Sequence, residues 1–427
     1  MYAIIKSYNA RGVCLMKKYK VKPYNSYYHY KHNKSMRIKF LIMSLICLIG
    51  MGLILGIYRN EIKNFYEEHI MVETANEKKE VQPFYFQEGP KNYHLFKVPV
   101  KVKGIYIPSR KMSELDSYLE LARKTDINAF VIDIKDDEGY ITFHTDNQKL
   151  VQMGSVKKNP PIKNINQAIA KMYEEDIYPI ARIVAFKDSA LGEKSSDRVI
   201  HDTKGNIYRT PREKQVWLNP YDKRNWAYIL EIAKEAANLG FKEIQLDYVR
   251  FHESMNSDRV QLDPNKSKAT VITEFINYMS EELKEYNVYV SADVFGAIIT
   301  SKRDGEIVGQ DYRQMVKKLD YISPMVYPSH YGKGSFGIEY PDLSPYDIIL
   351  GAMEASSDVI KQNPREERKA IVRPWLQDFT ASWLDPHQKY GKKQIQDQIK
   401  ATYDAGLDEW ILWNSSGRYT ESALLNE

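Results

Sequence analysis

The sequence predicts an α/β protein, a (β/α)8 TIM barrel preceded by a single transmembrane helix and a stalk. Short β-branched segments alternate with longer amphipathic segments from residue 102 onward, which indicates a parallel sheet covered by helices. This unit occurs eight times, the number of strands in such a barrel. An uncharged apolar run nearer the N-terminus predicts the membrane helix.

The spacing of apolar residues sets the limits of each element. The predicted strands span residues 102–108, 129–135, 178–185, 242–249, 288–295, 321–327, 369–375 and 409–413. The predicted helices span residues 114–125, 165–176, 223–239, 269–286, 312–319, 346–361 and 392–405. Gly240 and Gly406 stand where helix C-terminal caps are expected. A doubly wound open sheet is the alternative, but no glycine-rich turn follows the first strand.

The composition limits the possible functions. Of the 427 residues, 43% are hydrophobic and 27% are charged, as is typical of a globular chain. Only 2 cysteines are present, which excludes a disulfide framework and a cysteine-built zinc site. The net charge of +5 is unevenly distributed, because the first 60 residues contain eleven Lys or Arg and no Asp or Glu. The remainder is mildly acidic, so no nucleic-acid partner is expected.

The N-terminal segment predicts a membrane-anchored protein. Residues 40–58 carry no charge, and a helix of this length, rising ~1.5 Å per residue, spans the ~30 Å hydrocarbon layer. Basic residues precede the run and Glu61 follows it, so residues 1–39 are predicted to form a cytoplasmic tail. Residues 59–101 are then a stalk, and residues 102–427 are an extracytoplasmic domain at the cell membrane. A cleaved signal peptide and a start at Met36 are the alternatives.

Aspartates interrupt apolar strands at the end where barrel enzymes carry their active sites. Asp133, Asp247 and Asp293 end the second, fourth and fifth predicted strands, although Asp is disfavoured within strands. A helix or turn cap is the alternative role for each. Asp247 and Asp293 lie on neighbouring strands, and glycoside hydrolysis requires a facing carboxylate pair, one protonated and one ionised. A separation near ~5 Å between the two would retain the anomeric configuration.

Further side chains at the same strand ends are candidates for substrate binding. Asp133 is one of them, and Arg250 is expected to pair with Asp247 and to keep it ionised. The other candidates are Tyr106, Tyr327, Gln377 and Asn414. Flat apolar platforms for sugars are available among Tyr106, Trp217, Tyr248, Tyr327, Trp375, Trp383 and Trp413. Of these, Trp375 and Trp413 lie in strand segments and are expected in the core.

No cofactor and no metal are expected. The 9 histidines include no HExxH or HxxxH spacing, and no GxSxG motif indicates a serine nucleophile. Binding of Mg²⁺ or Ca²⁺ by the strand-end aspartates is a minor alternative.

Six segments, in order, resemble the glycoside hydrolase-like domain family of exported bacterial proteins, a barrel family distantly similar to α-amylases. They read VKGIYIPS, NAFVIDIKDDEG, EIQLDYVRF, SADVFG, ISPMVYPSHY and RPWLQDF, and the resemblance runs from about residue 102 to the C-terminus. It implies a glycosidase with Asp247 as nucleophile, Asp293 as acid and Asp378 as a third catalytic carboxylate. At the acid position the α-amylase-like enzymes usually carry Glu, which is one methylene longer than Asp293.

The function most consistent with these observations is a membrane-anchored glycoside hydrolase acting on cell-wall or extracellular polysaccharide. A non-catalytic carbohydrate-binding barrel and a metal-dependent polysaccharide esterase or deacetylase are the alternatives. If the barrel only binds carbohydrate, replacing Asp293 by Asn would leave glycan binding almost unchanged. If it is a metal-dependent esterase or deacetylase, a chelator would abolish its activity. An envelope scaffold is a further class, without a sequence feature in its favour.

Overall fold

The computed structural model describes residues 2–8, 14–20 and 101–425. The chain divides into two compact units, Met1–Gln87 and Glu88–Glu427. In the first, β1 (Tyr2–Tyr8) and β2 (Cys14–Lys20) form an antiparallel pair. The predicted transmembrane helix at residues 40–58 and the predicted stalk up to residue 100 lie outside the described residues. Within the described ranges, no helix is long and apolar enough to cross a membrane.

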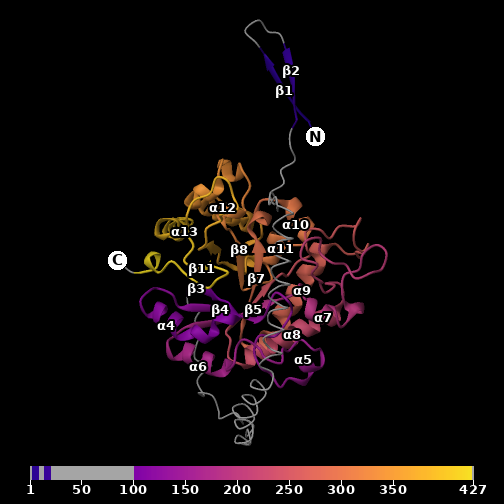
Figure 1. The fold of residues 1–427 in the computed structure, drawn as a ribbon, viewed down its shortest axis with the longest axis vertical. Helices are drawn as coiled ribbons and strands as arrows, with labels where there is room; N and C mark the ends of the chain where they lie inside the picture. The colour runs from indigo at the N-terminus through magenta and orange to yellow at the C-terminus, as the bar shows by residue number, and fades with distance from the viewer. Residues whose placement is uncertain (1, 9–13, 21–100, 426–427) are drawn as a thin grey trace, which may run out of the picture. The chain divides into compact units, whose positions relative to one another are not determined.

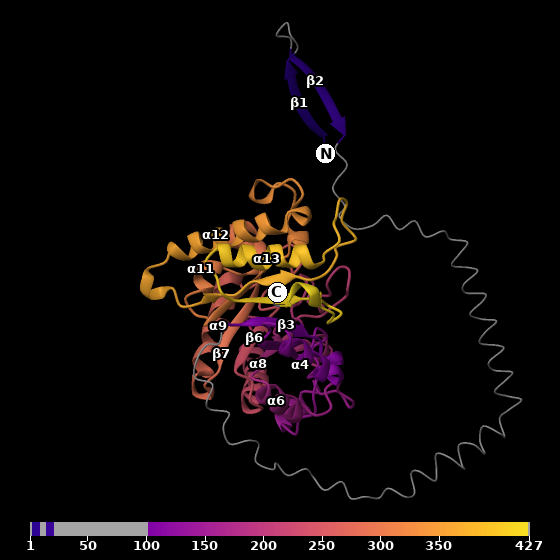
Figure 2. The same cartoon turned by 90° about the vertical axis from the view of Figure 1, so that its left-hand side faces the viewer.

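The second unit is an eight-stranded parallel β-barrel surrounded by helices (Figure 1, Figure 2). All its strands pair in parallel, and β10 pairs with both β8 and β11, which closes the sheet. This closure confirms the predicted barrel and rules out the open doubly wound sheet. The strands are β3 (Lys103–Ile107), β4 (Ala129–Lys135), β5 (Tyr178–Val184), β6 (Glu243–Asp247), β7 (Tyr289–Phe295), β8 (Tyr321–Met325), β9 (Ile371–Val372), β10 (Trp375–Gln377) and β11 (Trp410–Trp413).

The seventh barrel strand differs from the predicted continuous segment at residues 369–375. It is divided into β9, which pairs with β8, and β10, which continues the pairing toward β11. Pro374 lies between the two pieces and has no amide hydrogen, so it cannot donate to the ladder there. The strand therefore extends two residues beyond its predicted end, to Gln377.

Helices follow the strands at the predicted positions. They include α4 (Leu115–Arg123), α6 (Ile165–Glu174), α8 (Lys223–Asn238), α9 (Lys268–Glu282), α11 (Tyr312–Met315), α12 (Pro345–Lys361) and α13 (Lys392–Asp404). Gly240 and Gly406 adopt positive φ just after α8 and α13, as expected for C-terminal caps. Three short helices were not predicted: α5 (Gln148–Gln152), α7 (Ser189–Gly192) and α10 (Lys302–Val308).

Side chains that point into the barrel form a separate small core. It contains Val131, Ile180 and Ile411 at mid-height, whereas the larger core lies between the barrel and its helices. Toward the N-terminal ends of the strands, Arg373 donates to the Glu243 carboxylate, and both side chains are fully buried. The Arg373 guanidinium also lies over the Tyr321 ring, 4.2 Å from its centroid. The opposite, C-terminal end of the barrel carries the aspartates predicted to be functional.

Candidate active site

Arg182 joins two of the predicted aspartates at the C-terminal end of the barrel. It lies on β5, between Asp133 on β4 and Asp247 on β6. Its Nη1 donates to Asp133 Oδ1 at 2.6 Å, while its Nε and Nη2 donate to Asp247 Oδ2 at 2.9 and 2.6 Å. All three side chains are buried. Burial opposes the charge on Arg182, but the neighbouring carboxylates outweigh it and raise the pKa of the guanidinium well above its ordinary value.

Asp247 has its second carboxylate oxygen held by the backbone. Its Oδ1 accepts a hydrogen bond of 2.6 Å from the amide of Tyr248, a residue whose φ is +48°. The left-handed turn at Tyr248 brings that amide back toward the preceding carboxylate. Both carboxylate oxygens of Asp247 thus accept hydrogen bonds, Oδ2 from Arg182 and Oδ1 from the backbone.

Asp293 on β7 lies in a different environment. It is 2% exposed, and its described hydrogen bond to a side chain comes from Trp375 Nε1, which donates to Oδ1 at 2.6 Å. Burial, and then the negative charge of Asp247, raise its pKa well above the ordinary value. The two aspartates predicted to act as a pair therefore differ: one faces a cation, and the other favours the protonated form.

Asp133 and Tyr106 extend this network. The Tyr106 hydroxyl donates to Asp133 Oδ2 at 2.5 Å, and the Arg182 guanidinium lies 5.8 Å from the centroid of the Tyr106 ring. Burial raises the pKa of Asp133, although the charge of Arg182 opposes the shift. Both predicted binding residues are thereby connected to Asp247 through one guanidinium.

Aromatic rings line the same end of the barrel. Tyr106 stacks with Trp413 at 6.5 Å between centroids, and Trp413 lies 5.8 Å from Tyr327. Burial, followed by the charges of Asp293 and Asp247, raises the pKa of Tyr327 well above its ordinary value. Trp413, expected in the core, is instead partly exposed.

Arg250 does not form the expected ion pair with Asp247. Its guanidinium lies over the rings of Phe295, Tyr248 and Trp217, at 4.4, 5.1 and 5.2 Å from their centroids. The carboxylate closest to its Nη1 is that of Glu253, at 3.6 Å. Arg182 forms the ion pair with Asp247 instead, because its strand β5 is hydrogen-bonded to β6 along its length. Arg250 lies three residues beyond the end of β6.

The three remaining predicted site residues bond to the surrounding loops. Asp378 accepts hydrogen bonds from the amide and hydroxyl of Thr420, both at 2.8 Å. Gln377 accepts from the amide of Ser329 at 3.1 Å and donates to the Phe379 carbonyl at 2.9 Å. Asn414 accepts from the amide and hydroxyl of Ser416 and donates to the Asp378 carbonyl. None of these described bonds reaches Asp133, Asp247 or Asp293.

Two charged residues that were not predicted complete the rim of the site. Lys187 Nζ lies 3.1 Å from Asp137 Oδ1 and 3.4 Å from the Tyr248 hydroxyl. Burial would raise the pKa of Asp137, but the charges of Arg182 and Lys187 outweigh it and lower the pKa.

Arg182 itself was detectable by the criterion that identified the aspartates, since it is a charged residue within the apolar run YPIARIVA. Among the described residues, no three His, Cys, Asp or Glu side chains are placed to hold a metal ion together.

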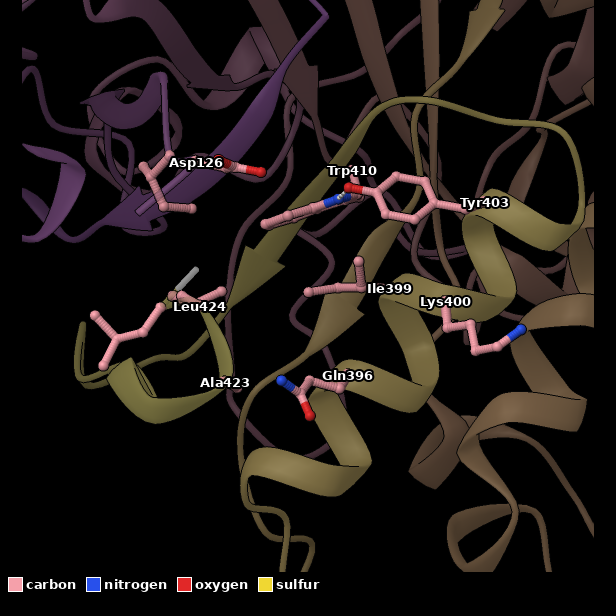
Figure 3. Close-up of a pocket in the computed structure, with 10 residues that line it drawn as sticks. Asp126, Gln396, Ile399, Lys400, Tyr403, Trp410, Ala423 and Leu424 are labelled. Atoms are coloured by element: carbon pink, nitrogen blue, oxygen red, sulfur yellow. Dashed lines mark hydrogen bonds between the residues drawn. The ribbon is translucent and has the colours of Figure 1, made fainter. Parts of the chain in front are cut away.

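A pocket of about 260 Å³ lies elsewhere, between the start of β11, α13 and a short 3-10 helix at Glu421–Ala423 (Figure 3). It is lined by Trp410, Ile399 and Tyr403, and by residues that precede β4. Since Trp410 begins β11, this pocket belongs to the N-terminal end of the barrel. None of the site aspartates lines it.

The family model described as "Putative glycosyl hydrolase domain" matches residues 104–419, which include every strand of the barrel apart from Lys103, the first residue of β3. The chain belongs to this family. The match covers the same segments whose motifs resemble exported glycoside hydrolase-like domains.

One solved structure supports the fold. The glycoside hydrolase domain of PgaB (BpsB) from Bordetella bronchiseptica is 12% identical, covers 77% of this chain and 100% of its own, and superposes with a TM-score of 0.54. A hypothetical protein from Ruminiclostridium thermocellum is 34% identical over 44% of this chain and 97% of its own, with a TM-score of 0.41. The comparison with curated proteins found no match.

Replacing Arg182 by Met should destabilise the barrel by about 3–5 kcal/mol, because two buried carboxylates would lose their shared cation. Urea unfolding followed by circular dichroism measures the change. Arg224→Met is the matched control: Arg224 also pairs with two aspartates, Asp197 and Asp222, but on the surface, and its loss should leave stability nearly unchanged. Equal stability of the two variants would contradict the proposed importance of the buried guanidinium.

Proposed function

We propose that this barrel hydrolyses glycosidic bonds, with Asp293 as the general acid and Asp247 as the nucleophile. The observation that carries the proposal is the unequal environment of the two strand-end carboxylates. Asp247 is paired with the buried cation of Arg182, whereas the pKa of Asp293 is raised by burial and by the charge of Asp247. A glycosidase needs one carboxyl protonated and one ionised at the same pH.

The reaction follows from these two states. Asp293 transfers its proton to the glycosidic oxygen as the bond from that oxygen to the anomeric carbon breaks, and an oxygen of Asp247 bonds to this carbon. Water then attacks the carbon, gives a proton to the Asp293 carboxylate and releases Asp247. Oδ1 of Asp247 accepts one described hydrogen bond, which leaves a lone pair for the attack. Placement of the pair on adjacent strands supports retention of configuration.

The other charged residues then have positioning roles. Arg182 holds the Asp247 carboxylate by an ion pair, and Asp133 with Tyr106 keeps Arg182 in place. Asp378, whose oxygens both accept from Thr420, secures the C-terminal segment and is not assigned to the chemistry. No cofactor is required by this scheme.

The substrate that we propose is a cell-wall or extracellular polysaccharide. Support comes from the uncharged segment at residues 40–58, flanked by basic residues on its N-terminal side, which would anchor the barrel outside the cytoplasm. The aromatic rings around the carboxylates supply apolar faces on which sugar rings pack.

Release of reducing ends from a panel of bacterial wall and extracellular polysaccharides should depend on both aspartates. Asp247→Asn and Asp293→Asn should each lower the rate by about 10²–10⁴-fold, since each loses one chemical role. Asp146→Asn, at a side chain 98% exposed, is the control and should keep the full rate. Full release by both site variants would overturn the assignment. Saturable binding without release by the wild type would favour the non-catalytic barrel.

The pH dependence of that activity tests the role of Asp293. The hydrogen bond from Trp375 stabilises the carboxylate form and so opposes the rise in the pKa of Asp293. Trp375→Phe removes the donor, the pKa should rise further, and the alkaline limb of kcat/KM should move up by about 0.5–1 pH unit. Trp410→Phe, which removes an indole donor bonded to Tyr403, should leave the limb in place. A limb that moves down in Trp375→Phe would contradict Asp293 as the protonated group.

A further inference from the structure

The aromatic rings of the site continue outward beyond the carboxylates. The Phe379 ring lies 5.3 Å from Trp413 and 5.8 Å from Tyr327, both of which belong to the candidate site. Trp383 then stacks on Phe379, with centroids 6.0 Å apart and planes inclined by 19°. Four rings therefore form a continuous series from the buried end of the barrel to the surface.

Exposure changes along this series. Tyr327 is 6% exposed, whereas Trp383 is 47% exposed and is among the most exposed large apolar side chains of the described residues. The exposed part of the indole extends the apolar surface of the neighbouring rings, and contiguous apolar surface of this kind marks ligand-binding sites. The His330 ring lies edge-on to both outer rings, and burial lowers its pKa, so a neutral imidazole borders the stack.

The loop that carries Trp383 is held in place by Asp342, a 3% exposed residue on the preceding strand-to-helix loop. Asp342 Oδ2 accepts from the Gln388 amide at 3.1 Å, and its carbonyl accepts from the Tyr390 hydroxyl at 3.1 Å. Gln377 also reaches Oδ1, at 3.4 Å. These bonds connect the loops after β8 and β10, so the rings are positioned before any ligand arrives.

We propose that Phe379 and Trp383 form an outer subsite for the sugar chain whose scissile bond lies at Asp247 and Asp293. This inference rests on the proposed function and specifies its substrate as a polymer that occupies several subsites. The stacked rings present a flat apolar face, which matches the C–H face of a pyranose ring. The contacts of Phe379 with Tyr327 and Trp413 make the outer subsite continuous with the aromatic rings of the candidate site.

Calorimetric binding to the full-length protein tests the subsite. The parent is Asp293→Asn, so that the sugars are not cleaved, and the probes are peptidoglycan glycan strands, chitin oligosaccharides and maltooligosaccharides. Each probe is used as fractions of two, four and six sugars. One of these oligosaccharide series is expected to bind the parent. For that series, Trp383→Ala should lower the affinity for the four- and six-sugar fractions by about 3- to 10-fold and leave the affinity for the two-sugar fraction unchanged. Trp383→Phe, which keeps an aromatic face, should restore most of the affinity.

Tyr403→Ala is the matched control. Tyr403 is 40% exposed on α13 and lines the pocket at the opposite end of the barrel, so its loss should change no sugar affinity. Unchanged binding of every fraction by Trp383→Ala would overturn the outer subsite and leave the proposed catalysis intact. Equal weakening of the two-sugar and six-sugar fractions would also overturn it. Failure of the parent to bind any fraction would overturn the subsite and count against a carbohydrate function as well.

Discussion

One buried guanidinium, that of Arg182, joins two of the carboxylates at the barrel mouth. Arg182 lies between Asp133 and Asp247 and donates to both, so the two carboxylates share one guanidinium in a site largely shielded from water. A buried charge is costly unless it is paired, and removal of this cation would leave two like charges facing each other. Asp293 has no such cation among its described hydrogen-bond partners, only the indole of Trp375. Burial and the negative charge of Asp247 then raise the pKa of Asp293.

A second buried pair of a carboxylate and an arginine lies at the N-terminal end of the barrel interior. Glu243 begins β6 and Asp247 ends it, and each meets an arginine from another strand, Arg373 or Arg182. Apolar side chains such as Val131 and Ile180 separate the two charged layers. A shift of any strand by one residue would turn these charges toward the surrounding helices and strand them in the larger apolar core. The paired charges thus favour one register, and that register places the aspartates together.

The sequence was sufficient for the barrel and for the location of the carboxylates, because both depend on local patterns. Alternation of strand and helix gave the fold, and an Asp within an apolar strand marked Asp133, Asp247 and Asp293. The side chains from other strands that bond to these carboxylates could not be predicted from such local patterns. Arg182, not Arg250, pairs with Asp247, and Trp375 bonds to Asp293 although its strand position predicted only a core residue. These contacts depend on strand register and closure, which no local pattern contains.

The same limit applies to Asp378. The family resemblance implies a third catalytic carboxylate at this position, and in the structure Thr420, 42 residues later in the chain, donates hydrogen bonds to both of its oxygens. Gln377 similarly bonds to loops that only the folded chain brings near it. A polar residue at a strand end can serve either the chemistry or the attachment of a loop, and its partners decide which.

The central claim is that Asp293 holds a proton at neutral pH, while Asp247 is paired with the Arg182 guanidinium. Infrared difference spectroscopy between the wild type and Asp293→Asn at neutral pH measures this directly through the C=O stretch of a protonated carboxyl. We predict that the wild type shows this band and that Asp293→Asn lacks it, while Asp247→Asn does not abolish it. A spectrum at neutral pH in which Asp293 contributes only carboxylate bands would contradict the account.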